Sequence, residues 1–135
     1  MRHELYSAIA ETLRSMEEIE HVDLWNKNVE YIEQEAWSRP AVFIELEPIS
    51  WSTTTSVHYM GRCRVRLHVV TDWSEEADSI RAWDLSEKIQ RALRDIKAQN
   101  ITSLALRESH TNHNHEDIME SIEVYEVRGV RRMDE

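Results

Sequence analysis

The segment SVHYMGRCRVRLHVVTDW, residues 56–73, carries the longest strand pattern in the chain. Because successive side chains of a strand point to opposite faces, the segment predicts one apolar face and one mainly basic face. The apolar face holds Val57, Tyr59, Cys63, Val65, Leu67 and Val69, and the basic face holds His58, Met60, Arg62, Arg64, Arg66 and His68. The segment therefore predicts a long strand that is buried on one side.

Two other segments have the periodicity of amphipathic helices. Residues 4–16 place Leu5, Ile9, Leu13 and Met16 at helical spacing. Residues 74–100 form a second apolar stripe, with its end near Asn100, and the stripe consists of Leu85, Ile89, Ala92, Leu93 and Ile96. Each pattern predicts a helix that buries one face.

Further strand patterns surround these helices. Residues 41–47 alternate apolar and other side chains until Pro48, and a polar turn or loop is expected at 52–56. Residues 21–32 suggest a strand broken by a turn, and two more strands are expected at 101–109 and 117–130. The order of elements predicts an α+β fold, with a mainly antiparallel sheet of about four strands packed against two helices.

The composition indicates a single domain over residues 1–135, in which residues 128–135 could form a flexible tail. With 135 residues, 41% of them hydrophobic, and five tryptophans, the chain can bury one substantial core. The single cysteine, Cys63, cannot form an internal disulfide. The N-terminal segment does not resemble a signal peptide and no apolar run is long enough to span a membrane, so a soluble protein made in a cytoplasm is expected.

The net charge of −10 argues against a dedicated nucleic-acid binder, because such affinity comes mainly from cations that neutralise phosphates. Arg62, Arg64 and Arg66 form the exception. The ordinary interpretation is a cross-strand charge ladder with Glu45 and Glu47 on the neighbouring strand. Two alternatives stay open: a small DNA-binding module built on the three arginines, and a contact with acidic residues of another subunit.

The segment SHTNHNHED, residues 109–117, raises the question of a metal-dependent enzyme. His110, His113 and His115, with Glu116 or Asp117, could in principle bind zinc. Their spacing matches no established ligand pattern, and the asparagines favour a hairpin loop between two strands. A glycine-rich phosphate loop and a nucleophile motif are both absent from the sequence, and Cys63 lies on an apolar face. We therefore expect no enzyme, no metal and no cofactor.

The succession of short segments resembles phage and prophage tail-terminator or tail-completion proteins over roughly residues 5–127. The segments that carry the resemblance are LYSAIAETL, HVDLWNKNVEYIEQE, RPAVFIELEPISWST, RLHVVTD, LSEKIQRAL and HNHEDIMESIEVYEV. The resemblance implies a small α+β fold and a homo-oligomeric ring, usually a hexamer, that caps the tail tube and joins it to the head. It also implies that His113, Asn114 and His115 belong to a structural or interface loop. The arginine-rich strand and the GVRRMDE terminus depart from the family.

Several expectations follow if this resemblance holds. The partners are further copies of the chain, the tail-tube protein and head–tail connector proteins, with no membrane, and the location is the virion tail after assembly in the bacterial host cytoplasm. DNA passes through the ring without specific binding, because six acidic copies repel phosphates. The candidate subunit-interface residues are Arg62, Arg64, Arg66, Glu45, Glu47, His113 and His115.

Overall fold

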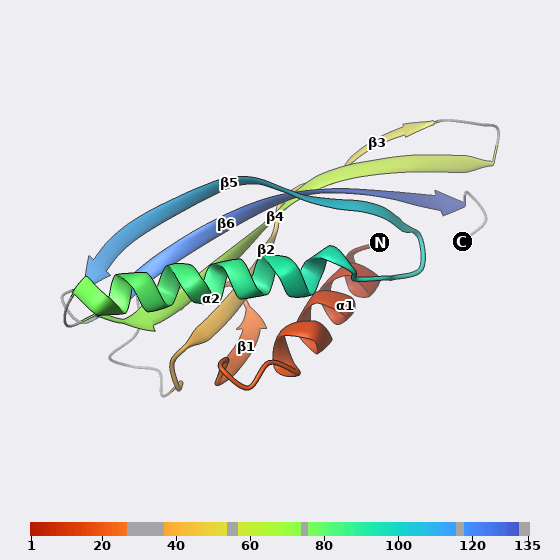
Figure 1. Ribbon diagram of the computed structural model, residues 1–135. Coiled ribbons are helices and arrows are strands. Elements are labelled where there is room, and N and C mark those ends of the chain that lie inside the picture. The colour runs from red at the N-terminus through yellow and green to blue at the C-terminus, as the bar shows by residue number, and fades with distance from the viewer. Residues whose placement is uncertain (27–36, 54–56, 74–75, 116–117, 133–135) are drawn as a thin grey trace.

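The computed structural model describes residues 1–26, 37–53, 57–73, 76–115 and 118–132. Over these residues the chain forms two helices and six strands (Figure 1). In chain order they are α1 (Arg2–Arg14), β1 (His21–Leu24), β2 (Ala41–Leu46), β3 (Ser50–Thr53), β4 (His58–Asp72), α2 (Glu76–Arg94), β5 (Ile101–His115) and β6 (Ile118–Arg132). The predicted α+β class and its two helices are confirmed.

The described strands form one mixed sheet in the order β1-β2-β4-β6-β5. The strand β6 pairs with β4 along its whole length, whereas β2 and β3 share the opposite edge of β4. Strand β1 runs parallel to β2, and the other pairs are antiparallel. The prediction of a mainly antiparallel sheet of about four strands is therefore wrong in the number of strands, and the sheet is mixed because β1 runs parallel to β2.

Two strands beyond those four have little apolar patterning: β1, at the start of the segment expected as a broken strand, and β3. In β3, which occupies part of the expected polar loop, every residue is exposed, so backbone pairing with β4 holds the strand rather than side-chain burial. In β1 the one buried residue is Val22, and four residues are too few to display a period. Residues 27–36, which complete the segment expected as a broken strand, lie outside the described residues.

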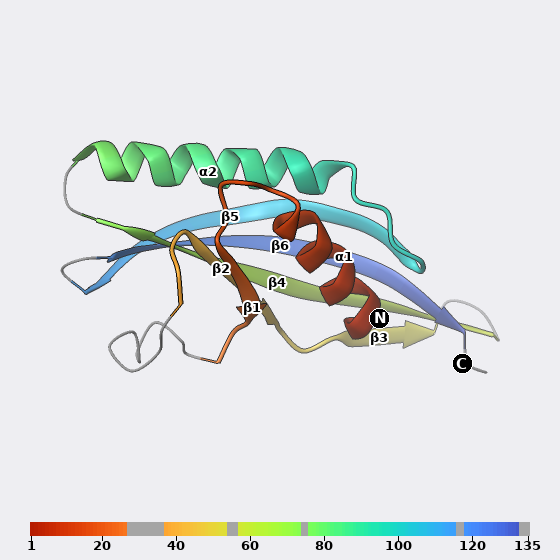
Figure 2. The ribbon, with the colours of Figure 1, turned by 90° about the horizontal axis from the view of Figure 1, so that it is seen from below.

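Both helices lie on one face of the sheet, which we call the covered face (Figure 2). From α1, Leu5, Ile9 and Leu13 are buried there, as the helical spacing predicts. The second stripe is also confirmed, since Ile89 and Leu93 are almost fully buried. Helix α2 ends at Arg94 rather than near Asn100, which has a positive φ of 69° in the turn before β5. Among the described residues, neither helix is long and apolar enough to cross a membrane.

The opposite face of the sheet, which we call the open face, is apolar at one end. Phe43 and Val70 are fully buried there, with Trp25 and Trp37 packed against their cluster. The ring of Trp37 meets Phe43 edge to face, with 5.1 Å between centroids. Strand β4 is consequently buried on both faces from Leu67 to Thr71, and the alternation predicted for it ends at this point.

The histidine-rich segment extends the hairpin of β5 and β6. Strand β5 continues through His115, which pairs with Ile118 of β6, so the segment expected as a loop is mostly strand. Register shifts occur within β5, including one between Asn112 and His115. At the other end, β6 continues to Arg132, into the segment for which the composition suggested a flexible tail.

Candidate assembly surfaces

The arginines of β4 lie on the open face of the sheet. Arg62 is the cross-strand partner of Arg128, and Arg64 is the partner of Glu126. Arg62 and Arg64 are exposed, whereas Arg66 is partly buried. Cys63 and Val65, which alternate with the arginines along β4, are buried on the covered face. The three arginines therefore share the opposite face, as the sequence predicted.

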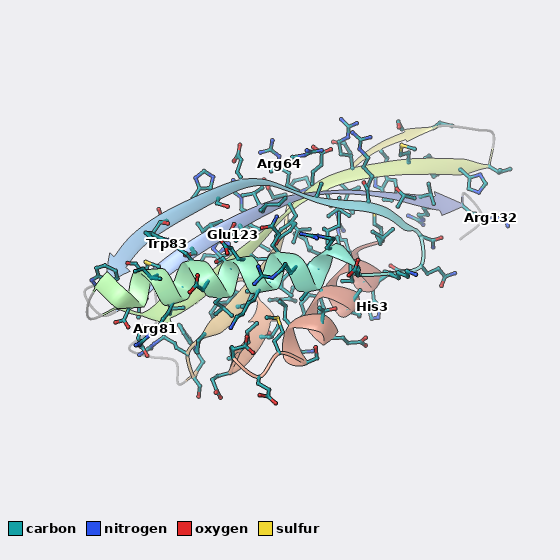
Figure 3. The ribbon with its side chains drawn as sticks, viewed as in Figure 1. His3, Arg64, Arg81, Trp83, Glu123 and Arg132 are labelled. Carbon is teal, nitrogen blue, oxygen red and sulfur yellow. The ribbon has the colours of Figure 1, made fainter. Side chains whose placement is uncertain are left out.

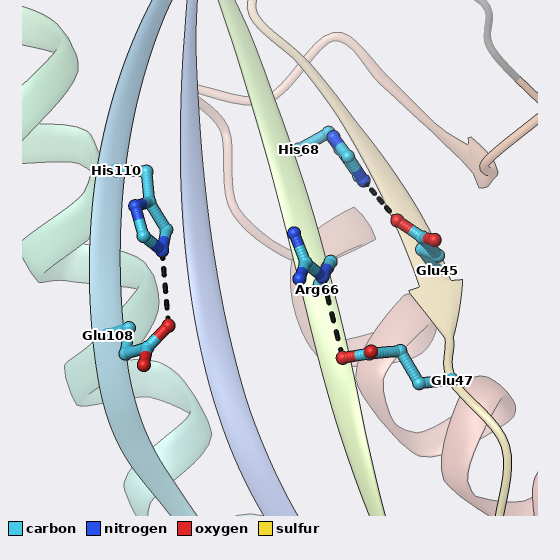
Figure 4. Close-up of polar contacts among 6 residues, drawn as sticks. All are labelled: Glu45, Glu47, Arg66, His68, Glu108 and His110. Carbon is cyan, nitrogen blue, oxygen red and sulfur yellow. Dashed lines mark hydrogen bonds and ion pairs between the residues drawn. The ribbon is translucent and has the colours of Figure 1, made fainter.

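The predicted charge ladder forms in part. Arg66 Nε lies 3.4 Å from Glu47 Oε2 (Figure 4). Glu45 is the register partner of Arg66, but its carboxylate contacts His68 instead. Within the described part of the chain, neither Arg62 nor Arg64 forms an ion pair. Two of the three arginines are therefore available to an external partner.

His68 is buried between two carboxylates, a relationship that the sequence pattern did not predict. Its Nδ1 lies 2.7 Å from Glu120 Oε2, and its Nε2 lies 2.8 Å from Glu45 Oε1 (Figure 4 shows the second contact). His68 and Glu120 are only 4% and 3% exposed. Because ionised carboxylates accept but do not donate hydrogen bonds, both ring nitrogens must donate if both acids are charged, which makes the ring a cation.

A sequence signal for this burial does exist. Val69 and Val70 are consecutive apolar residues, as are residues 41–44 of the neighbouring strand. Such runs are typical of strands with both faces covered, because a half-exposed strand alternates instead. The position of His68 beside this run indicates a buried histidine rather than a member of an exposed basic face.

The histidines at the tip of the hairpin are not brought into an observed metal site. His110 is half exposed, and its Nε2 lies 3.2 Å from Glu108 Oε2 (Figure 4). The side chains of His113 and His115 lie outside the described set, as do Glu116 and Asp117. Among the side chains that are described, no group of three histidine, cysteine, aspartate or glutamate residues is arranged to hold a metal ion.

A second buried carboxylate lies on the covered face, beneath α2. Glu123 is 6% exposed and accepts a hydrogen bond from the Ser109 hydroxyl. Burial, and secondarily the charge of Glu123, raise the pKa of the nearby Tyr125 phenol. A pocket between α2 and β5 reaches this carboxylate, with Trp83 at its rim. Glu123 falls on the apolar face of β6 in the alternating pattern of the sequence, and this position could have indicated that its carboxylate is buried.

One end of the sheet forms a basic projection that we call the distal arm, made of β3, residues 57–62 and residues 128–132. It extends past the end of α2 (Figure 1). The two glycines of the chain, Gly61 and Gly129, are cross-strand partners in it. An added Cβ would lie 2.9 Å from Met1 Sδ at Gly61 and 3.0 Å from it at Gly129. Because glycine has no side chain at these two positions, Met1 at the start of α1 can pack closely against the arm.

Aromatic and basic side chains gather on the distal arm. Trp51 and Tyr59 meet edge to face at 6.3 Å, and both are exposed, as are Val57 and Met60. One pocket of the arm, of about 270 Å³, is lined by Ser50, Trp51, Ser52, Met60, Arg62 and Arg128. Another, of about 310 Å³, is lined by Met1, Arg2, His3, Ile49, Trp51 and Arg131. His3 and Arg132 mark this end of the molecule in Figure 3.

At the opposite end of β4 lies a cleft of about 400 Å³, which we call the acidic cleft. It is lined by Glu18, Pro40, Thr71, Asp72, Asp78, Arg81, Ala82, Asp84, Leu85 and Lys88. Four carboxylates therefore face two cations around a partly apolar floor. Arg81 and Trp83 mark this end of the molecule in Figure 3, far from Arg132.

Comparisons with known proteins show a shared fold. No protein-family model and no curated protein sequence matches the chain. Among solved structures, the chain is similar to one described as "Virion of native gene transfer agent (GTA) particle", with 13% sequence identity and a TM-score of 0.65. The similarity covers 96% of this chain and 97% of the other. At this identity, the likeness demonstrates the same architecture over nearly the whole length of both chains.

Proposed function

We propose that this protein is a structural component of a phage or phage-like particle, and specifically a tail terminator or tail-completion protein. The observation that carries the proposal is the fold shared, over nearly all of both chains, with a chain of a gene transfer agent virion. The sequence segments that resemble tail-terminator proteins support the same role independently. The protein then acts by assembly, without catalysis and without a cofactor, in the particle's tail.

In this role, copies of the chain form a ring, usually of six, that caps the tail tube and joins it to head–tail connector proteins. Six copies at −10 carry about −60 in total. If part of this negative charge lines the channel, the channel repels DNA phosphates and the genome passes through without adhering. Basic side chains are correspondingly reserved for protein contacts.

Two of the candidate interface residues are better suited to a subunit contact than the others. Arg62 and Arg64 are exposed and form no ion pair within the described part of the chain. By contrast, Glu45 contacts His68, and Arg66 and Glu47 contact each other. His113 and His115 remain candidates at the hairpin tip, on the end of β5.

A DNA-binding function is the second candidate, because the arginines of the open face could contact phosphates. Its test is a titration of duplex DNA at physiological ionic strength. The ring proposal predicts no appreciable binding. Submicromolar affinity that falls steeply with salt, and that disappears in an Arg62→Ala, Arg64→Ala, Arg66→Ala triple variant, favours the DNA-binding module instead.

The ring itself is tested by light scattering across a wide protein concentration range, followed by electron microscopy with and without tail tubes of the particle. We expect closed rings in solution at high concentration or on tube ends. A protein that remains monomeric throughout and leaves tubes uncapped contradicts the proposal. Capsid, connector and tail-tube genes adjacent to the coding gene would support it, whereas a metabolic operon would argue against it.

A further inference from the structure

Positive charge is concentrated in two segments that meet in the structure. Between Glu47 and Asp72 the sequence contains three arginines and no acid, and the same holds between Glu126 and Asp134. The remaining residues contain the other 10 basic residues and all 26 acidic residues, a formal charge of −16. Because β4 pairs with β6, both acid-free segments contribute to the distal arm. The molecule therefore has one basic end and an acidic remainder.

Within the distal arm, two like charges face each other directly. Arg62 and Arg128 are cross-strand partners, and both are exposed. Like charges at directly opposed positions destabilise a sheet. Arg128 Nη2 lies 3.4 Å from Glu126 Oε1, so Arg62 is the member of the pair that has no ion pair within the described part of the chain. An acidic group placed between the two guanidinium groups would remove the repulsion. The exposed Met60 and Trp51 line the same pocket and supply apolar contact area.

The acidic cleft has the complementary properties at the other end of β4. Glu18, Asp78 and Asp84 line it together with the apolar Leu85 and Ala82. Asp84 is exposed and forms no ion pair within the described part of the chain. At roughly 3.3 Å per strand residue, Arg62 and Asp72 lie on the order of 30 Å apart. The arm therefore cannot reach the cleft of its own chain.

We propose that the distal arm of one copy docks in the acidic cleft of the next copy. This inference rests on the proposed ring and specifies the surfaces that form it. Two different, complementary surfaces at opposite ends of one molecule define a head-to-tail contact, and such contacts generate rings when the rotation closes. The arm supplies cations and aromatic side chains, whereas the cleft supplies carboxylates and an apolar floor. Association is accordingly sensitive to salt.

Charge reversal tests this contact. The arm variant is Arg62→Glu with Arg128→Glu, which keeps two like charges opposed and so preserves the local strand pairing. The cleft variant is Glu18→Lys with Asp84→Lys, both at exposed positions. Controls with the same change in net charge are Arg94→Glu with Lys97→Glu and Glu11→Lys with Asp95→Lys, all exposed and none of them lining the acidic cleft or the two pockets of the arm. Circular dichroism and thermal melting establish that each variant is folded.

The measurement is sedimentation velocity over a concentration series. We expect each control to assemble like the wild type. The arm and cleft variants should each need at least about tenfold higher concentration for half-assembly, because like charges then face each other. An equimolar mixture of the two should assemble again, since each reversed arm meets a reversed cleft in alternation.

Two results overturn this contact while leaving the ring in place: arm and cleft variants that assemble like the wild type, or two folded variants whose mixture does not assemble. A wild-type protein that forms no ring, in solution or on tail tubes, overturns the proposed function and this contact together. The two failures are therefore distinguishable in one series.

Discussion

The rings of Trp25 and His68 stack, with 3.8 Å between their centroids and 4° between their planes. Trp25 directly follows β1, and His68 lies on β4, so the stack reaches across the intervening β2. Trp25 also meets Phe43 edge to face at 6.3 Å. These ring contacts link the edge strand β1 to the central strand β4, and they cover one end of the open face.

Replacement of this indole should be costly. We expect Trp25→Ala to lower the free energy of unfolding by about 2–4 kcal/mol, because it uncovers Phe43 and His68. Trp83→Ala is the matched control, since Trp83 is 51% exposed, and should change stability by at most about 0.5 kcal/mol. Urea unfolding followed by circular dichroism gives both values. Equal losses in the two variants would contradict the structural role of the stack.

The paired carboxylates around His68 lead to a second prediction. His68→Ala leaves Glu120 buried without the imidazole donor, so we expect a loss of about 3 kcal/mol or more. A double variant, His68→Leu with Glu120→Leu, removes both polar groups and should be more stable than His68→Ala. The comparison is again made by denaturant unfolding. A loss below about 1 kcal/mol in His68→Ala would show that the carboxylate is already satisfied without the ring.

The two glycines of the distal arm should differ in their tolerance of a methyl group. At Gly61 the nearest atoms to an added Cβ belong to the side chains of Trp51 and Met1, at 2.8 and 2.9 Å. At Gly129 the nearest atom is the backbone oxygen of Asn100, at 2.8 Å, which is less able to move. We therefore expect Gly129→Ala to destabilise the protein more than Gly61→Ala, each by about 1–3 kcal/mol. Thermal melting in parallel checks the order, and the reverse ranking would refute this packing.

Cys63 provides a pH-dependent test of the core beneath the helices. Its side chain is buried against the covered face, and burial raises the pKa of the thiol. A raised native pKa means that the folded state holds the proton more tightly, so this contribution to stability is complete below the unfolded pKa and is lost as pH rises. Between about pH 7 and about pH 10, the wild type should lose more stability than Cys63→Ala. Identical losses would indicate an accessible thiol.

Much of the fold could be predicted from local periodicity, and the exceptions have specific physical causes. The stripes of α1 and α2 and the alternation of β4 up to Arg66 are read directly from residue spacing, because each faces one apolar layer. Strand β3 has no buried side chain, so its backbone pairing leaves no hydrophobic signal. The histidine-rich segment contains turn-prone asparagines, yet strand pairing with β6 carries it almost to its end.

The candidate site was predictable only in its composition. Spacing placed the arginines on one face, but the cross-strand register decides that Arg62 meets Arg128, whereas Arg66 reaches Glu47. The burial of His68 depends on Trp25, which comes from a distant strand end. The two acid-free segments are far apart in the sequence, and only the pairing of β4 with β6 brings them together in the distal arm. These contacts depend on how distant strands pair, and local sequence patterns do not contain that information.

The most direct test of the central claim is the mass and shape of the protein as it assembles. Light scattering at increasing concentration, combined with negative-stain electron microscopy of the same samples and of samples with tail tubes, measures both. The account predicts closed rings, most often of six copies, free in solution or on tube ends. A protein that is monomeric at every concentration and never associates with tubes would contradict it.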